Sequence, residues 1–418
     1  MQRKQVFEGL KVADFAWVGV GPQVGRELAE HGATVVRVES HRVPDSLRTF
    51  TPYYEGRPGV DRTMFGVCFN TQKYSMSVDL SKPKGRDIAR KLVAWADLVA
   101  ESFTPGTMAK WGLDYESCKK IKPDIIYYST CQQGQWGPYA NFGAYGQFTA
   151  AMAGYSHATG WPEREPNVTY NNYTDFISPW YLTIAVIGAL LYRRKTGKGM
   201  YMEQGQYQAG VTFMGPAILD CAVNGRVAGR PGNRDPYAVP HGAYPCLGND
   251  RWVAIAVRSD EEWRALCRAM GDPEWTKDPR FATFLGRKEN EQELDGLVAE
   301  WTKDFNDREL MALLQANGVS AGVVETCEDL VEVDPQLKHR EHFRRLPHRV
   351  MGMRAWNAPA YRLSKTPNHI WKAGAVIGED NEFVYKKILG LTDNDISNLL
   401  AEDVITTEAD LPAVGESY

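Results

Sequence analysis

A strand, a helix and a second strand at the start of the chain constrain its fold more than any other feature. Residues 10–17 (LKVADFAW) are an apolar run of strand length, and residues 33–39 (ATVVRVE) are a second run rich in β-branched side chains. Between them, a glycine-rich turn leads into a helical pattern over residues 22–31. Two strands joined by a helical crossover lie parallel in one sheet, so the sequence predicts an α/β domain.

The α/β pattern continues, and a second, smaller domain follows it. We expect a helix over residues 84–95 and strands over residues 97–100 and 124–129. A chain of 418 residues is longer than a domain with a single hydrophobic core usually is. Residues 224–244 are rich in Gly, Pro, Arg and Asn, which is typical of a linker. Beyond the linker, the patterns predict a strand at residues 252–257 and helices at 261–270, 289–302 and 308–315. Residues 319–324 are expected to lead back toward the larger domain, and the acidic stretch from Glu402 is expected to be solvated.

Charge and cysteine usage exclude several classes of protein. A net charge of -4 argues against a nucleic-acid binder. The seven cysteines are scattered, without metal-ligand spacing, which favours a reduced cytoplasm and no bound metal. The apolar segment 180–192 is too short to span a bilayer, so we expect a soluble protein that does not enter a membrane.

The turn after the first strand imitates a dinucleotide-binding fingerprint. Gly19, Gly21 and Gly25 follow the strand, and Glu39 ends the next one. The third glycine is displaced by one position, and Pro22 removes a backbone N–H from the helix start that would hold a pyrophosphate. We therefore interpret the glycines as the small residues that a tight turn needs.

Asp175 is the strongest single candidate for chemistry. Ser178 is placed to be an N-cap and Pro179 a first helical residue, so the positive end of the following helix dipole is predicted to face Asp175 and keep it ionised. Such a carboxylate is a general base, a metal ligand, a covalent nucleophile or only a helix cap. The residues around it leave these roles open.

Several short motifs, taken in order, resemble family III CoA-transferases, the family of formyl-CoA:oxalate and carnitine CoA-transferases. The resemblance runs over nearly the whole chain, and the order of the motifs makes it specific. They are Gly9-Leu-Lys-Val-Ala-Asp14-Phe, Gly21-Pro22, Gly32-Ala-Thr-Val-Val-Arg-Val-Glu39, Asp97-Leu-Val-Ala-Glu-Ser-Phe-Thr-Pro105-Gly106, Trp111-Gly112-Leu, Thr196-Gly-Lys-Gly199 and Asp334-Pro-Gln-Leu-Lys-His-Arg.

The resemblance implies an architecture for the whole chain. It implies a large Rossmann-like domain from residues 1–223 and 326–418 and a small α+β domain with its linker from residues 224–325. It also implies a dimer of two interlocked rings, formed by two copies or with a homologous subunit. A glycine-rich loop that covers the site in formyl-CoA transferases is not recognisable in the small domain, which argues against oxalate or formate as substrate.

The resemblance also implies a role for Asp175. In the family, this aspartate attacks an acyl-CoA, and the released CoA then forms an aspartyl-CoA thioester from which an acceptor acid takes CoA. By position, the contacts to coenzyme A fall on Val18, Gly19, Ser40, His41, Lys73, Val78, Ser102, Phe103, Lys110, Trp111 and Tyr145. Because the family often has Arg at positions 40 and 110, and Asn at position 102, phosphate recognition is expected to involve His41, Arg42 or Lys110.

Two other functions stay open. α-Methylacyl-CoA racemases share the fold but use a His and an Asp, and the stretch that holds their His is Gly143-Ala144-Tyr145 here. A CoA-binding subunit of a heteromeric transferase is the second alternative. Aromatic residues near Asp175 in the sequence favour a bulky acceptor such as benzylsuccinate, with succinyl-CoA as donor, although core packing explains them equally well; they are Trp161, Tyr170, Tyr173, Phe176 and Trp180.

Overall fold

The structure is a computed structural model that describes residues 4–168 and 172–406. By its internal contacts the chain divides into two units. The larger unit comprises Met1–Tyr155, Val168–Arg226 and Leu337–Tyr418, and the smaller unit comprises Ser156–Asn167 and Val227–Gln336.

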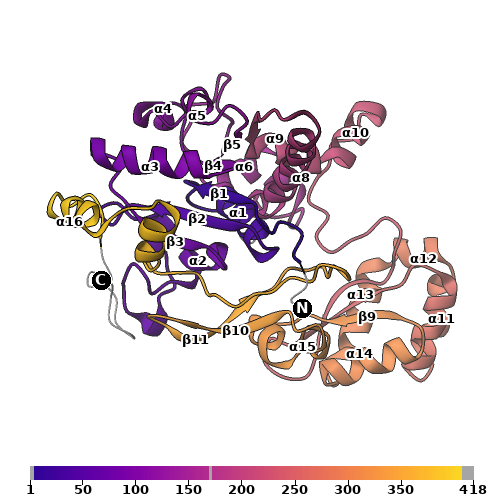
Figure 1. Cartoon of the computed structure of the whole chain (residues 1–418). Helices are drawn as coiled ribbons and strands as arrows, with labels where there is room; N and C mark the ends of the chain where they lie inside the picture. The colour runs from indigo at the N-terminus through magenta and orange to yellow at the C-terminus, as the bar shows by residue number, and fades with distance from the viewer. Residues whose placement is uncertain (1–3, 169–171, 407–418) are drawn as a thin grey trace. The chain divides into compact units, whose positions relative to one another are not determined.

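A parallel sheet of six strands forms the centre of the larger unit (Figure 1). Its order is β3-β2-β1-β4-β5-β6. The strands are β1 (Lys11–Asp14), β2 (Thr34–Glu39), β3 (Tyr74–Ser77), β4 (Leu98–Glu101), β5 (Ile126–Cys131) and β6 (Met200–Gly205). The predicted α/β class is confirmed. Strands β3 and β6, which form the two edges of the sheet, were not predicted from the sequence.

Successive residues of the strands alternate between two cores. Val12, Val35 and Leu98 contribute to a core shared with α1 (Val20–Glu30) and α8 (Tyr173–Thr196). Their neighbours Ala13, Val36 and Val99 contribute to a core shared with α3 (Pro83–Trp95) and α5 (Tyr115–Ile121). Burial on both faces explains why the strands are apolar runs rather than alternating patterns.

The remaining helices of the larger unit lie in the connections and after the last strand. They are α2 (Met64–Val67), α4 (Thr107–Trp111), α6 (Gly146–Met152), α9 (Gln206–Phe213), α10 (Gly215–Asn224) and α16 (Asp393–Ala401), while α7 (Tyr155–Ala158) and α15 (Pro335–His339) straddle the boundaries between the units.

The strand order reverses between β1 and β4. From β1 the chain proceeds through β2 to β3 on one side, and from β4 through β5 to β6 on the other. In sheets of this kind, the loops at the carboxyl ends of the two central strands separate and leave a crevice for a ligand. The loops that follow β1 and β4 are joined there by Ser102, whose Oγ accepts from the backbone N–H of Trp17 (2.8 Å) and donates to its carbonyl (2.6 Å).

Two glycines of the β1–α1 turn have packing roles. A Cβ on Gly21 would lie 2.6 Å from the Cβ of Ala16, and one on Gly25 would lie 2.8 Å from Oδ2 of Asp14. Helix α1 therefore approaches its strand too closely for side chains at these positions. The structure supports the interpretation of Gly21 and Gly25 as the small residues that a tight turn needs.

Helix α8 begins earlier than predicted. It starts at Tyr173 with Asn172 as N-cap, so Asp175 lies in its first turn and Pro179 lies inside the helix. The prediction of Ser178 as N-cap was wrong, because a side chain from α1 replaces the backbone donor that Pro179 lacks, as described below. With 24 residues, α8 is the single helix of the described chain that is long and apolar enough to cross a membrane, contrary to the estimate from residues 180–192. Its buried face packs in the core, and 44% of its most apolar window is buried, so we interpret it as a core helix.

The C-terminal part of the chain returns to the sheet of the larger unit (Figure 1). It contains a hairpin of β10 (Phe343–His348) and β11 (Gly352–Asn357). The backbone N–H of Asp79 donates to the carbonyl of Val404 (2.9 Å), and Ile405 pairs with Val78. Val404 and Ile405 are buried, so the expectation of a solvated tail from Glu402 was wrong for these residues. Their apolar side chains complete the core under β3.

The smaller unit has its own sheet and core. Strands β7 (His241–Pro245), β8 (Trp252–Ala256) and β9 (Ser320–Val323) form an antiparallel sheet in that order. The helices α11 (Asp260–Ala269), α12 (Phe284–Glu289), α13 (Glu291–Thr302) and α14 (Asp307–Ala316) accompany it. Because β9 pairs with β8, residues 319–324 do not lead out of this unit as expected but complete its sheet.

Candidate active site

A cavity lies at the carboxyl ends of the strands, where their order reverses. It has a volume of about 150 Å³, and loops after β1, β4, β5 and β6 line it together with the first turn of α8. The lining residues include Trp17, Val18, Gly19, Ser102, Thr104, Cys131, Gln133, Phe142, Tyr145, Asp175 and Gln206. Five of the predicted site residues, Val18, Gly19, Ser102, Tyr145 and Asp175, are therefore brought together around one cavity.

Glycines on two sides allow the backbone to approach the Asp175 carboxyl group closely. A Cβ on Gly146, the first residue of α6, would lie 2.3 Å from Oδ1 of Asp175. A Cβ on Gly19 would lie 3.3 Å from Oδ2. Oδ1 also accepts a hydrogen bond from the side-chain amide of Gln206. The carboxyl group thus accepts a hydrogen bond from Gln206 on its Oδ1 side, while its Oδ2 side lies next to Gly19, a residue that lines the cavity.

The carbonyl of Asp175 is held by a residue of another helix. In a regular helix this carbonyl would accept from the N–H four residues later, which is the position of Pro179. Instead, Nε2 of Gln23 in α1 donates to it (2.9 Å) and also to the carbonyl of Gly19 (3.2 Å). Gln23 therefore links the turn after β1 to the backbone of Asp175.

Burial raises the pKa of Asp175 to about 6, and hydrogen bonds from Gln206 and Asn172 oppose this shift. The pKa of Asp175 is therefore higher than the helix dipole alone predicts, but the carboxyl group is still mostly ionised at pH 7. By contrast, burial raises the pKa of Cys131, in the same cavity, to about 11. Asp175 is therefore the better ionised nucleophile of the two.

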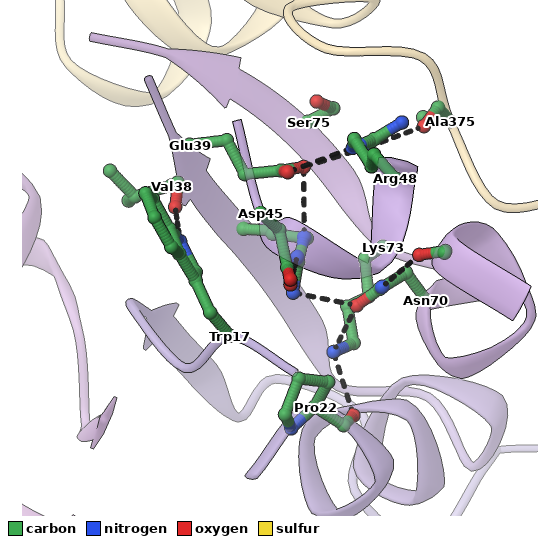
Figure 2. Close-up of polar contacts among 12 residues, drawn as sticks. Trp17, Pro22, Val38, Glu39, Asp45, Arg48, Asn70, Lys73, Ser75 and Ala375 are labelled. Carbon is green, nitrogen blue, oxygen red and sulfur yellow. Dashed lines mark hydrogen bonds and ion pairs between the residues drawn. The ribbon is translucent and has the colours of Figure 1, made fainter. Parts of the chain in front are cut away.

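A buried ionic network supports the turn that carries Val18. Val18 has a φ of 64°, in the left-handed region that β-branched residues avoid, and its N–H donates to Oδ2 of Asp45 (2.8 Å). The same oxygen accepts from Arg37 (2.7 Å), and Arg37 also contacts Glu39 (2.9 Å). Arg48 continues the network from Glu39 to the carbonyl of Ala375 (Figure 2). The two guanidinium groups lower the pKa of Glu39 against the effect of burial.

Lys73 belongs to this buried region and not to the cavity. Its side chain is 1% exposed, and Nζ donates to Asp14 (2.7 Å). Nζ also donates to the carbonyl of Pro22 (2.7 Å) and to Asn70 (2.9 Å) (Figure 2). These partners use all three donors of the ammonium group. Lys73 therefore has no donor left for a phosphate, and the predicted CoA contact of its side chain does not fit the structure.

The other predicted residues do not line the cavity, and most of them lie in two groups. Phe103 packs edge-on against Trp17 (5.2 Å between centroids) and against Trp111 (5.3 Å), and the exposed Lys110 precedes Trp111 in α4. Ser40 and His41 follow β2, where Ser40 Oγ accepts from the N–H of Arg42 and His41 contacts Ser77 and Asp403. Val78 is buried beside Ile405, which leaves its side chain no surface for a ligand.

The aromatic residues near Asp175 in the sequence do not form a pocket around it. Tyr173 packs on Tyr155 and Phe213, while Phe176 and Trp180 line a different cavity, between α1, α8 and the segment after β11. Trp161 belongs to the smaller unit, and Tyr170 lies outside the described residues. The aromatic residues that line the Asp175 cavity are Trp17, Phe142 and Tyr145.

Gln23, Gln206 and Gly146 were missed by the sequence analysis. They are single polar or small residues at helix starts, without a motif around them, and each acquires its role only from contact with Asp175. No group of three His, Cys, Asp or Glu side chains able to hold a metal occurs within residues 4–168 and 172–406.

Comparison with known proteins gives a consistent result. The model of CoA-transferase family III matches residues 7–381. The chain is 30% identical over 399 residues to succinyl-CoA–D-citramalate CoA-transferase of Chloroflexus aurantiacus, covering 95% of this chain and 98% of that protein. It is 28% identical to the β subunit of succinyl-CoA–L-malate CoA-transferase of the same organism, over 95% and 97% of the two chains. The crystal structure of a CAIB/BAIF family protein from Brucella suis superposes with a TM-score of 0.84 at 31% identity, over 92% of this chain and all of that one.

Proposed function

The chain belongs to CoA-transferase family III and is a CoA-transferase, and we propose that it moves CoA from succinyl-CoA to a carboxylic acid through an aspartyl-CoA thioester on Asp175. The observation that carries this proposal is the position of Asp175: a carboxylate, mostly ionised at neutral pH, that lines a cavity at the switch point of the sheet.

The chemistry explains why the nucleophile is a carboxylate. Attack of the carboxylate on an acyl-CoA forms a mixed anhydride and releases the CoA thiolate. The thiolate then attacks Cγ of Asp175, expels the donor acid and forms the aspartyl-CoA thioester. The acceptor acid repeats both steps in reverse. A serine or cysteine would instead carry the acyl group and could not carry CoA.

The proposed CoA site extends from the cavity along the loop after β4. Val18, Gly19, Ser102 and Tyr145 line the cavity and are proposed to contact the thioester end. Phe103 and Trp111, whose rings are in contact, are proposed as the next part of the CoA site. Lys110, which precedes Trp111 in α4, is proposed to bind a phosphate group. Ser40 and His41 stay proposed as contacts from the end of β2. Lys73 and Val78 are left out because their side chains are buried among other partners.

A racemase is the weaker alternative. Proton transfer at an α-carbon by this fold requires a second acid or base opposite the aspartate. The lining residues of the cavity, all within the described chain, include no histidine, and Gly143-Ala144-Tyr145 stands at the position where the resemblance expects one. A subunit that only binds CoA would not need a carboxylate in the cavity, so the presence of Asp175 also favours a catalytic chain over a CoA-binding subunit.

The acceptor is proposed to be a dicarboxylic acid. The two relatives described above are named for succinyl-CoA as donor and for hydroxylated dicarboxylic acids as acceptors. Trp17, Phe142 and Tyr145 offer aromatic surface in the cavity, which keeps benzylsuccinate as the bulky candidate.

We propose that the enzyme assembles as an interlocked dimer, with a second copy or with a homologous subunit. Helix α8 presents a stripe of exposed apolar side chains at helical spacing, in which Ile184 is 69% exposed. The stripe consists of Trp180, Ile184, Ile187 and Leu191. Because one relative is named as a β subunit, both a second copy of this chain and a homologous subunit are to be tested as partners. Sedimentation of the purified chain, alone and with co-purified partners, tests the assembly.

The activity is tested by a donor and acceptor screen with the purified protein. Succinyl-CoA, acetyl-CoA and other acyl donors are combined with malate, citramalate, glutarate and benzylsuccinate, and the CoA esters are separated by chromatography. The proposal predicts a new CoA ester of a dicarboxylic acid with succinyl-CoA as donor. Exchange only with other donors or only with monocarboxylic acids would contradict it.

A further inference from the structure

Gln206 is a buried residue in direct contact with the reacting carboxyl group. It is the first residue of α9, directly after β6, and is 2% exposed. Its Nε2 donates to Oδ1 of Asp175 and lies 2.9 Å from Oγ1 of Thr174. Thr174 Oγ1 in turn donates to the carbonyl of Gly146 (3.3 Å). The amide is therefore held in place before any substrate binds.

The contact makes the two oxygens of Asp175 different. Oδ1 is enclosed by Gln206 and by the backbone of Gly146. Oδ2 lies on the side of Gly19, which lines the cavity, whereas Gly146 on the Oδ1 side does not line it. A carboxylate attacks with the oxygen that can reach the substrate, and this oxygen is Oδ2.

The subsequent steps place negative charge on the other oxygen. Once Oδ2 is bonded to the acyl carbon, Oδ1 is the carbonyl oxygen of the aspartyl half of the anhydride. Attack of the CoA thiolate on Cγ forms the C–S bond and moves an electron pair onto Oδ1. Collapse of this intermediate breaks the bond from Cγ to Oδ2, so the donor acid leaves with Oδ2 and Oδ1 stays on the protein. Attack of the acceptor carboxylate on the thioester charges Oδ1 again, expels the CoA thiolate and inserts an acceptor oxygen in place of Oδ2.

We propose that Gln206 is a catalytic residue whose side-chain N–H stabilises the oxyanion that forms on Oδ1 of Asp175, and that it determines which oxygen of Asp175 is exchanged. The inference rests on the aspartyl-CoA route of the proposed function. A preorganised donor at a developing oxyanion is worth about a hundred- to thousandfold in turnover, since it is already oriented when the charge appears. Gln206 acts on the two steps at Cγ and not on the attack at the acyl carbon.

The test compares Gln206→Met with Gln208→Met and the wild-type enzyme. Methionine keeps the length of glutamine but has no N–H, and Gln208 is an exposed residue of the same helix that does not line the Asp175 cavity. Circular dichroism, thermal unfolding and CoA binding establish that each variant is folded. Gln206→Met is expected to lower kcat by about a hundredfold or more, while Gln208→Met stays near wild type.

A second measurement counts exchanged oxygens. Enzyme is cycled with donor and with an acceptor that carries ¹⁸O at both carboxylate oxygens, and the peptide with Asp175 is weighed. The wild type is expected to gain one heavy oxygen, since Oδ1 is held, and Gln206→Met is expected to gain two, since its carboxyl group rotates between turnovers. Two heavy oxygens in the wild type, or a Gln206→Met kcat within about threefold of wild type, would overturn the inference. No heavy oxygen at Asp175 in an active enzyme would overturn the aspartyl route itself, and the inference with it.

Discussion

The side-chain amide of Gln23 donates to the backbone carbonyl of Asp175 (2.9 Å), the carbonyl that Pro179 leaves without its helical donor. A proline inside a helix usually weakens it, because a hydrogen bond is lost. In this protein the lost bond is replaced by one between α1 and α8, so Gln23 can couple the turn after β1 to Asp175.

Replacing Gln23 with leucine removes this coupling. We expect Gln23→Leu to lower the free energy of unfolding by about 1–3 kcal/mol, because the Asp175 carbonyl loses its partner in a buried setting. We also expect kcat to fall, because Asp175 and the Gly19 turn are no longer tied together. Chemical denaturation and steady-state assays measure both, with Gln292→Leu, on the exposed side of α13, as the matched control. Equal effects of the two variants would contradict the role of Gln23.

Gly146→Ala tests the close approach of the backbone to Asp175. Its Cβ would lie 2.3 Å from Oδ1, so the carboxyl group must move off Gln206. A displacement of this kind typically costs about a hundredfold in turnover. Gly296→Ala, in an exposed helical position of α13 with nothing within 4 Å, is the control and should keep full activity. An unimpaired Gly146→Ala enzyme would show that the carboxyl position is not restricted as described.

The pH dependence of turnover follows from the raised pKa of Asp175, which is about 6. Protonation removes the proposed nucleophile, so the rate should fall by about tenfold for each unit of pH below this value and reach a plateau above it. The inflection of kcat/KM against pH measures this pKa in the free enzyme. Because the Gln206 hydrogen bond lowers the pKa, the inflection of Gln206→Met should lie at higher pH. An inflection near 4 in both proteins would contradict the burial argument.

The Asp14–Lys73 pair is predicted to support the fold rather than to bind CoA. Lys73→Met leaves the buried Asp14 without its partner, and we expect a loss of about 3–5 kcal/mol in the free energy of unfolding. The double variant Asp14→Leu with Lys73→Met removes both charges and should recover much of this loss. CoA affinity, measured by calorimetry on the double variant, is expected to stay near wild type. A large loss of affinity in a stable double variant would restore Lys73 to the CoA site.

The parallel sheet could be predicted from the sequence because its signals are local. Strands such as residues 33–39 are buried on both faces, and a continuous apolar run of β-branched residues follows from that burial. Three helices of the smaller unit, α11, α13 and α14, were predicted to within a few residues for the same reason, since each shows its own periodic apolar face. The short helix α12 was not predicted.

The start of α8 and the position of Lys73 depend on distant contacts. Ser178-Pro179 is a sequence typical of a helix start. A proline is acceptable inside the helix because Gln23 donates to the carbonyl of Asp175, 152 positions further along the sequence. Lys73 is a residue type that often binds phosphate, but its positive charge is paired in the core with Asp14, 59 positions away in the sequence. Motif order located Asp175, whereas its hydrogen-bond partners Gln206 and Gln23 could be found only from the folded chain.

The proposed covalent intermediate on Asp175 is tested most directly by trapping. The enzyme is incubated with succinyl-CoA without acceptor, quenched in acid, digested and weighed, in parallel with Asp175→Ala. The account predicts a peptide containing Asp175 that carries CoA, which hydroxylamine converts to a hydroxamate at that residue, and no such product in Asp175→Ala. An active enzyme whose Asp175 peptide stays unmodified, or an Asp175→Ala enzyme that still exchanges CoA, would contradict it.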